Sequence, residues 1–239
     1  MSGCVPRAAV RTYMQHAVRA TELDLRKAMC DVGRRMYLKN LVAATDGNIS
    51  IRIAPDRFLC TPSGISKGYM EPGDMIIADE KGNKLAGKGR VTTEFLTHLA
   101  AYEERPDIRA VCHAHPPKAV GFSLAGVSLA EYVLPEVVMT FGGIPTTEYA
   151  TPASAEGNKV IRDLIRRCDA LLLMRHGAVT VGIDVYDAYH KMEKIEHAAE
   201  TLLAAHLLGE VRPLSMEEVE KLNQARERYG AGGRAYLGS

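Results

Sequence analysis

Short apolar runs separated by turn signals are the feature that most constrains how this chain can fold. In one run Ile49, Ile51 and Ile53 alternate with polar residues, which is typical of a strand with one buried face. Similar short runs occur at residues 58–60, 75–78, 108–112, 171–174 and 178–181, and a turn at residues 81–83 leads back toward residues 84–85. Several neighbouring runs are joined by turn residues alone, which favours β-hairpins.

Helical patterns are interspersed with these runs. They are expected at residues 20–41, 92–104, 185–208 and 215–228. Ser215 is the expected N-cap of the last helix. We therefore predict an α/β layered domain with a mixed or largely antiparallel sheet over residues 20–239. Residues 1–19 are expected to form a flexible N-terminal extension.

Charge and cysteine content narrow the class of protein. The chain of 239 residues has 30 Lys and Arg against 29 Asp and Glu, so it lacks the basic character of a nucleic-acid-binding protein. No run of about 20 apolar residues suggests a membrane helix, and no signal peptide is apparent. The five cysteines are odd in number and include no CxxC pair. We expect a cytoplasmic protein that acts on a small molecule.

Three histidines form the candidate metal site. His113 and His115 are two residues apart where a strand ends, so both rings project from one face. His176 is the third candidate, in a tight turn whose Gly177 allows backbone geometry that strains other residues. Three protein ligands with one open position are typical of catalytic zinc. The alternative is that the strand simply ends in two half-exposed histidines.

Other polar residues on the helices are expected to be structural. His98 fits a helix position in the core or on the surface. Glu193, Glu196 and Glu200 are expected on the solvated face of a long helix, where they form charge pairs.

A carboxylate and three turns complete the candidate site. Glu94 lies in the first turn of a predicted helix, but a capping box would need Ser or Thr where the chain has Val91. A catalytic role for Glu94 therefore stays open beside a role at the helix dipole. The segments Thr92-Thr93, Gly47-Asn48 and Ser63-Gly64 offer hydroxyls, amides and tight turns. Together they could form a phosphate pocket that needs no Arg or Lys.

In this order and spacing, several segments resemble the class II aldolase/adducin family, especially its L-fuculose-1-phosphate and L-rhamnulose-1-phosphate type aldolases. They are Gly47-Asn48-Ile49-Ser50, Thr61-Pro62-Ser63-Gly64, Thr92-Thr93-Glu94, His113-Ala114-His115, Gly142-Gly143, Arg175-His176-Gly177 and Tyr229-Gly230. The resemblance implies a three-layer α/β/α sandwich with a central, mainly antiparallel sheet. It also implies a homotetramer with active sites between subunits.

The resemblance assigns roles to the matching residues. It implies His113, His115 and His176 as ligands of Zn²⁺, or of another divalent ion such as Mn²⁺ or Co²⁺. Glu94 matches a catalytic carboxylate that can also contact the metal, and Tyr229 matches a tyrosine that transfers a proton from a neighbouring subunit. The matching phosphate-binding residues are Gly47, Asn48, Ser63, Gly64, Thr92 and Thr93. A second family tyrosine falls on Glu136, where this chain departs from the aldolase pattern.

Four functions are compatible with this site. The first is cleavage of a ketose 1-phosphate to dihydroxyacetone phosphate and an aldehyde through a metal-stabilised enediolate. The second is decarboxylation of a keto acid or hydroxy-aromatic dicarboxylate by the same enolate chemistry. A sugar-phosphate 4-epimerase is less favoured, because the related epimerase has Asp at the position of Glu94. An adducin-like domain without activity is disfavoured by the intact histidines.

Overall fold

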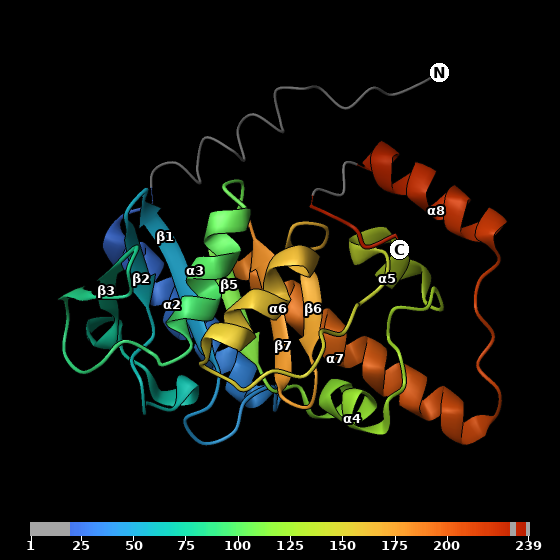
Figure 1. The fold of residues 1–239 in the computed structure, drawn as a ribbon, viewed down its shortest axis with the longest axis horizontal. Coiled ribbons are helices and arrows are strands. Elements are labelled where there is room, and N and C mark those ends of the chain that lie inside the picture. The colour runs from blue at the N-terminus through green and yellow to red at the C-terminus, as the bar shows by residue number, and fades with distance from the viewer. Residues whose placement is uncertain (1–19, 230–232, 238–239) are drawn as a thin grey trace.

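A computed structural model describes residues 20–229 and 233–237 of the chain (Figure 1). Its helices are α2 (Glu22–Leu38), α3 (Phe95–Glu104), α4 (Pro117–Ala125), α5 (Pro135–Phe141), α6 (Ala155–Ile165), α7 (Val185–Leu208) and α8 (Met216–Tyr229), with short 3-10 turns η1 (Lys67–Tyr69) and η2 (Pro72–Asp74). Its strands are β1 (Asn48–Ala54), β2 (Arg57–Cys60), β3 (Ile76–Asp79), β4 (Lys84–Ala86), β5 (Ala110–Ala114), β6 (Ala170–Leu173) and β7 (Gly177–Gly182). The predicted N-terminal extension lies outside the described residues.

The strands form one seven-stranded sheet in the order β4-β3-β2-β1-β5-β7-β6. Every pair of neighbouring strands is antiparallel. The predicted hairpins therefore form, and β5 lies between β1 and β7, where all five of its residues are buried. A side chain at the end of β5 can consequently meet groups from both halves of the sheet.

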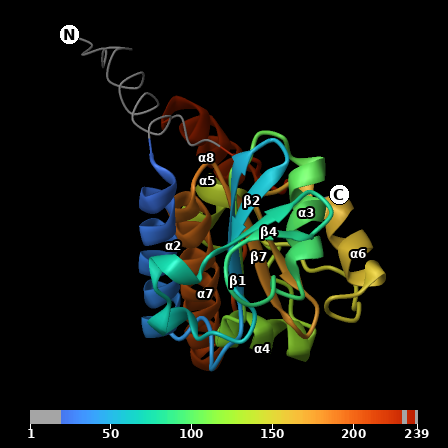
Figure 2. The ribbon, with the colours of Figure 1, turned by 90° about the vertical axis from the view of Figure 1, so that its left-hand side faces the viewer.

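Helices cover both faces of the sheet and produce three layers. Figure 2 shows α2 and α7 on one side of the strands and α3 and α6 on the other. One buried cluster, which includes Met29, Ile49 and Met192, fills the α2 and α7 side. A second cluster, which includes Phe95 and Ile161, fills the α3 and α6 side. The predicted α/β/α sandwich is confirmed.

The ends of the helices show where local sequence decides. Ser215 caps α8 as predicted, because its Oγ accepts from the Glu218 N–H at 3.3 Å. Helix α3 begins at Phe95 rather than at Thr92, since residues 92–94 form the turn that leads into it. Helices α4, α5 and α6 were not predicted. A signal for α6 exists in the sequence, where Ser154 accepts from the Gly157 N–H at 3.1 Å.

In the part of the chain that the structure describes, no helix is both long enough and apolar enough to cross a bilayer.

Candidate metal and catalytic site

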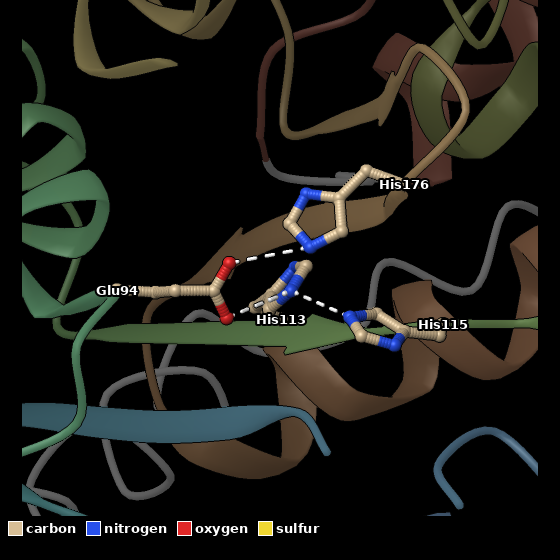
Figure 3. A group of neighbouring side chains, drawn as sticks. All are labelled: Glu94, His113, His115 and His176. Atoms are coloured by element: carbon tan, nitrogen blue, oxygen red, sulfur yellow. Dashed lines mark hydrogen bonds and ion pairs between the residues drawn. The ribbon is translucent and has the colours of Figure 1, made fainter. Parts of the chain in front are cut away.

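Four side chains from distant parts of the chain converge at the end of β5. Glu94 comes from the turn before α3, His113 from β5, His115 from the residue after β5, and His176 from the turn between β6 and β7 (Figure 3). One donor atom from each residue lies within 4.8 Å of all the others. Figure 3 shows the three rings and the carboxylate directed at a common centre.

The contacts within this group are short. His113 Nε2 lies 3.1 Å from His115 Nε2. The two oxygens of Glu94 divide between the other contacts, with Oε2 at 3.3 Å from His113 Nε2 and Oε1 at 3.2 Å from His176 Nε2. Three imidazole nitrogens and one carboxylate at these separations could hold a divalent ion, and this donor set suits zinc and its first-row neighbours.

Partners outside the group orient two of the rings. His113 Nδ1 lies 3.0 Å from the carbonyl oxygen of Ala178. Because a carbonyl can only accept, Nδ1 carries the proton and the lone pair of Nε2 faces the other ligands. His115 Nδ1 lies 3.5 Å from Asp46 Oδ2, so a carboxylate stands behind the second ring. Nothing local in the sequence links Asp46 to His115.

The turn that carries His176 contradicts the prediction made for Gly177. The residue with a left-handed backbone is Arg175, at φ 60°, while Gly177 has no positive φ. Gly177 is required for space instead. A Cβ there would collide with the Ala114 carbonyl and would lie 3.0 Å from His113 Cε1. The absence of a side chain at Gly177 is therefore what lets the histidine cluster close.

Two hydroxyl groups hold this turn from outside. Ser123 Oγ on α4 accepts from the Arg175 N–H at 2.9 Å. Thr147 Oγ1 accepts from the Met174 N–H at 3.3 Å. Both hydroxyls support a backbone that includes a strained left-handed residue, which fixes the position of His176. Sequence reasoning missed both residues, because they lie 52 and 27 positions from their partners.

Glu94 is the N-cap residue of α3, yet its side chain makes no capping hydrogen bond. The carboxylate instead turns toward the histidines and accepts from Asn48 Nδ2 at 2.9 Å. Burial raises the pKa of Glu94, but His113 and the amide of Asn48 outweigh it and hold the pKa below its ordinary value. Burial also lowers the pKa of His176, to about 4, so its ring is neutral near pH 7 and able to bind a metal.

The turns predicted to bind phosphate lie beside Glu94. Asn48 reaches Glu94 directly, and the Ser63 N–H donates to the Arg90 carbonyl at 2.9 Å. A bridge between Pro62 and Val91 brings the Ser63-Gly64 turn next to the Thr92-Thr93 segment. Gly47 and Gly64 both adopt the positive φ that such turns need, at 70° and 79°. The three segments are thus neighbours in space, and their phosphate role stays a prediction.

Other predicted residues lie elsewhere or differ from expectation. Tyr229 ends α8, and its side chain lies outside what the structure describes. Glu136 is exposed in the first turn of α5. His98 lies in the core, where its Nδ1 is 2.7 Å from Ser50 Oγ. The prediction for Glu196 was wrong, because it is buried and accepts from two N–H groups at the start of α4.

Comparisons with known proteins agree with this architecture. The sequence profile of the Class II Aldolase and Adducin N-terminal domain matches residues 27–203. An L-fuculose phosphate aldolase of Methanococcus maripaludis is 34% identical over 167 residues, which cover 70% of this chain and 89% of that protein. A 3-oxo-tetronate 4-phosphate decarboxylase of Haemophilus influenzae is 30% identical over 210 residues, which cover 84% of this chain and 97% of that protein.

Solved structures give the same answer. The L-fuculose-1-phosphate aldolase of Thermus thermophilus superposes with a TM-score of 0.68 at 28% identity, covering 77% of this chain and 95% of that one. Another L-fuculose 1-phosphate aldolase superposes with a TM-score of 0.78 at 25% identity, covering 85% and 96%. The relatives named here are enzymes, and their names include both aldolases and decarboxylases. The chain belongs to the class II aldolase and adducin family.

Proposed function

We propose that this chain is a zinc-dependent lyase that cleaves a ketose 1-phosphate to dihydroxyacetone phosphate and an aldehyde. The observation that carries the proposal is the group formed by Glu94, His113, His115 and His176. Among the described residues, the Glu94 side chain caps no helix and pairs with no Lys or Arg, and its carboxylate lies between the rings of His113 and His176. Mn²⁺ or Co²⁺ would suit the same donors.

The chemical difficulty of this reaction is negative charge. When the bond between C3 and C4 of the ketose breaks, its electron pair stays on C3 and the C4 hydroxyl loses its proton. A divalent ion at the three imidazoles supplies Lewis-acid stabilisation of the charge that develops on the ketone oxygen.

Protons are the task of the chain's own side chains. Glu94 is ionised at rest, so it takes up a proton before it delivers one to C3, and the hydrogen bond from Asn48 orients its carboxyl group for that transfer. Tyr229 from a neighbouring subunit takes the proton of the C4 hydroxyl as its own phenolic proton passes on, so one proton leaves the C4 oxygen for each proton that reaches C3. The turns at Gly47-Asn48, Ser63-Gly64 and Thr92-Thr93 bind the phosphate and thereby place C3 next to Glu94.

Decarboxylation is the second candidate, and two observations favour it. The decarboxylase of Haemophilus influenzae matches over most of both chains. In addition, Glu136 stands where the aldolase pattern has a tyrosine, on the exposed start of α5. In this reaction a 3-oxo acid phosphate loses carbon dioxide, and the electron pair again remains on a carbon that Glu94 protonates. The presence of Glu rather than Asp at position 94 favours either lyase over an epimerase.

A panel of phosphorylated substrates separates the two lyases. Zinc-loaded protein is incubated with ketose 1-phosphates and with 3-oxo acid phosphates, while dihydroxyacetone phosphate and carbon dioxide are measured separately. The proposal expects dihydroxyacetone phosphate together with an aldehyde from at least one ketose. Release of carbon dioxide without any aldehyde would contradict the aldolase proposal and favour the decarboxylase.

The metal itself is tested by content. The double variant His113→Ala/His115→Ala is expected to lose bound zinc, because only one imidazole and one carboxylate would remain. His190→Ala is the matched control, since His190 is an exposed histidine on α7. Equal zinc content in the double variant and the control would contradict the proposed metal site.

We further propose a cytoplasmic homotetramer with its active sites between subunits. Exposed leucines at the end of α7 support association, since Leu207 and Leu208 are 81% and 90% exposed.

A further inference from the structure

Lys67 is a buried lysine beside the candidate phosphate site. Only 1% of its surface is exposed. Its Nζ donates to the carbonyl oxygens of Thr45 at 2.8 Å and Ile65 at 2.6 Å. Ordering and burying an ammonium group costs free energy, and lysines are rarely buried so completely. Such a group calls for an explanation beyond packing.

The backbone around Lys67 is held closely against α2. A Cβ on Gly33 of α2 would lie 2.7 Å from the Lys67 carbonyl oxygen. A Cβ on Gly68 would lie 2.6 Å from Tyr37 Cγ, also on α2. The turn η1 therefore approaches the helix at two glycines, and its lysine is fixed by the core rather than by solvent.

The two carbonyls that Lys67 binds belong to two different phosphate-site turns. Thr45 lies two residues before Gly47, and Ile65 directly follows Gly64. The ammonium thus links the turn at Gly47-Asn48 to the turn at Ser63-Gly64. Both turns are left-handed at their glycines, and the link fixes the distance between them.

The charges around the site give the ammonium a second role. The residues predicted to contact phosphate are neutral, whereas Asp46 and Glu94 bring two carboxylates close to them. A phosphate dianion would be repelled by these carboxylates unless cations offset them. Burial lowers the pKa of Lys67 to about 8, and Asp46 raises it in part, so the ammonium stays mostly charged at pH 7.

We propose that Lys67 is a specificity-determining residue for phosphorylated substrates, because its ammonium clamps the two turns and supplies positive charge beneath the phosphate. The inference rests on the proposed phosphate-binding function. It also revises the expectation from sequence that this pocket needs no Lys. The role is one of positioning and charge, and Lys67 takes no part in proton transfer.

Binding of inorganic phosphate to the zinc-loaded full chain tests the inference, measured by calorimetry and as competitive inhibition of the lyase reaction. Lys67→Met keeps a side chain of similar length but removes the charge and both hydrogen bonds. Its phosphate affinity is expected to fall roughly tenfold to a hundredfold, as for loss of a charge-assisted contact. KM for a phosphorylated substrate should rise by a similar factor, with kcat changed far less.

Two further variants separate the role of the charge from the role of the clamp. Lys67→Gln keeps N–H donors without charge and should still bind phosphate weakly, whereas Lys67→Arg keeps the charge and should recover much of the affinity. Lys81→Met is the control, because Lys81 is an exposed lysine in the turn between β3 and β4. Zinc content and melting temperature report whether each variant is folded.

The outcomes distinguish the two proposals. If a folded, zinc-bound Lys67→Met or Lys67→Gln protein binds phosphate as the wild type does, the role of Lys67 is overturned and the proposed lyase stands. If Lys67→Met does not fold, the comparison of Gln with Arg decides in the same way. If the wild type binds no phosphate and converts no phosphorylated compound, the proposed function fails, and the role of Lys67 fails with it.

Discussion

At the scale of single residues, the site depends on how each polar group is held. Glu94 is partly buried beside Asn48, whose side-chain amide donates to its carboxylate and favours the charged form. His113 is fixed as one tautomer by the Ala178 carbonyl. These contacts prepare a carboxylate and a nitrogen lone pair before any ligand binds, so little reorganisation is needed when charge develops on a substrate.

Replacing Glu94 by Gln tests its role in proton transfer. The variant keeps the size of the side chain, and the three histidines remain, so zinc content should be unchanged. Turnover should fall by about 10² to 10⁴-fold, the usual contribution of a general acid or base. Steady-state kinetics and metal analysis on the same sample measure both effects. Glu80→Gln, at an exposed position, is the control, and full activity of Glu94→Gln would exclude Glu94 as the proton donor.

At the scale of elements, the central position of β5 brings the site together. Its neighbours β1 and β7 supply Asn48 beside His113 on one side and the partner carbonyl of Ala178 on the other. The turn between β6 and β7 then brings His176 over the end of β5, held by Ser123 and Thr147. The sheet order, more than any single motif, positions the ligands.

Gly177→Ala is expected to damage this arrangement. The added methyl group would meet His115 Cδ2 at 2.8 Å and the Ala114 carbonyl, so either the turn or the histidines must move. Zinc affinity should fall, and stability should decrease by about 1–3 kcal/mol, as for an overpacked core. Competition with a zinc chelator and thermal unfolding provide the measurements.

Gly121→Ala is the matched control for that variant. Gly121 lies in α4, and a Cβ there would meet nothing within 4 Å. Alanine should stabilise this helix by roughly 0.5–1 kcal/mol. Unchanged zinc affinity in Gly177→Ala would show that the close approach at this glycine does not matter for the ligands.

At the scale of the whole molecule, the three layers bury polar groups whose protonation is linked to folding. His98 is fully buried between α3 and the sheet, behind Glu94. Burial, with a smaller contribution from His113, lowers the pKa of His98 to about 3. Folding therefore favours neutral His98, and protonation of the unfolded chain acts against the folded state.

This linkage predicts acid sensitivity of the metal-free protein. Between about pH 6.5 and 3 the unfolded chain protonates His98 while the folded protein does not, so the unfolding free energy falls as the pH falls. In this range His98 lowers the unfolding free energy by up to about 1.4 kcal/mol for each unit that the pH falls. His98→Asn, whose Oδ1 can replace Nδ1 beside Ser50, should reduce the slope. Urea unfolding at several pH values measures it, and equal slopes in both proteins would contradict the assignment.

The proposed active site between subunits predicts complementation. Glu94→Gln and Tyr229→Phe subunits are each expected to have low activity. If tetramers formed from an equal mixture combine Glu94 of one subunit with Tyr229 of another, about a quarter of the sites should be complete. Activity that stays at the average of the two separate variants would place both residues in the same subunit or remove Tyr229 from the reaction.

Local patterns in the sequence determined much of the protein. Alternating isoleucines predicted β1, turn residues predicted the hairpins, and the two-residue spacing of His113 and His115 predicted that their rings act together. Each of these patterns depends on neighbours a few positions apart. The resemblance to a known family tied His176 to that pair and gave Glu94 a catalytic role.

Only the tertiary structure decided how these residues are held. Three separate contacts show this, and each spans tens of residues in the sequence. They join Asp46 to His115, Ser123 to the turn that carries His176, and Lys67 to the Thr45 carbonyl. Sequence periodicity shows which face a side chain occupies, but it does not show what lies opposite. That depends on the sheet order, which follows from packing the whole chain and determines which distant groups meet at the end of β5.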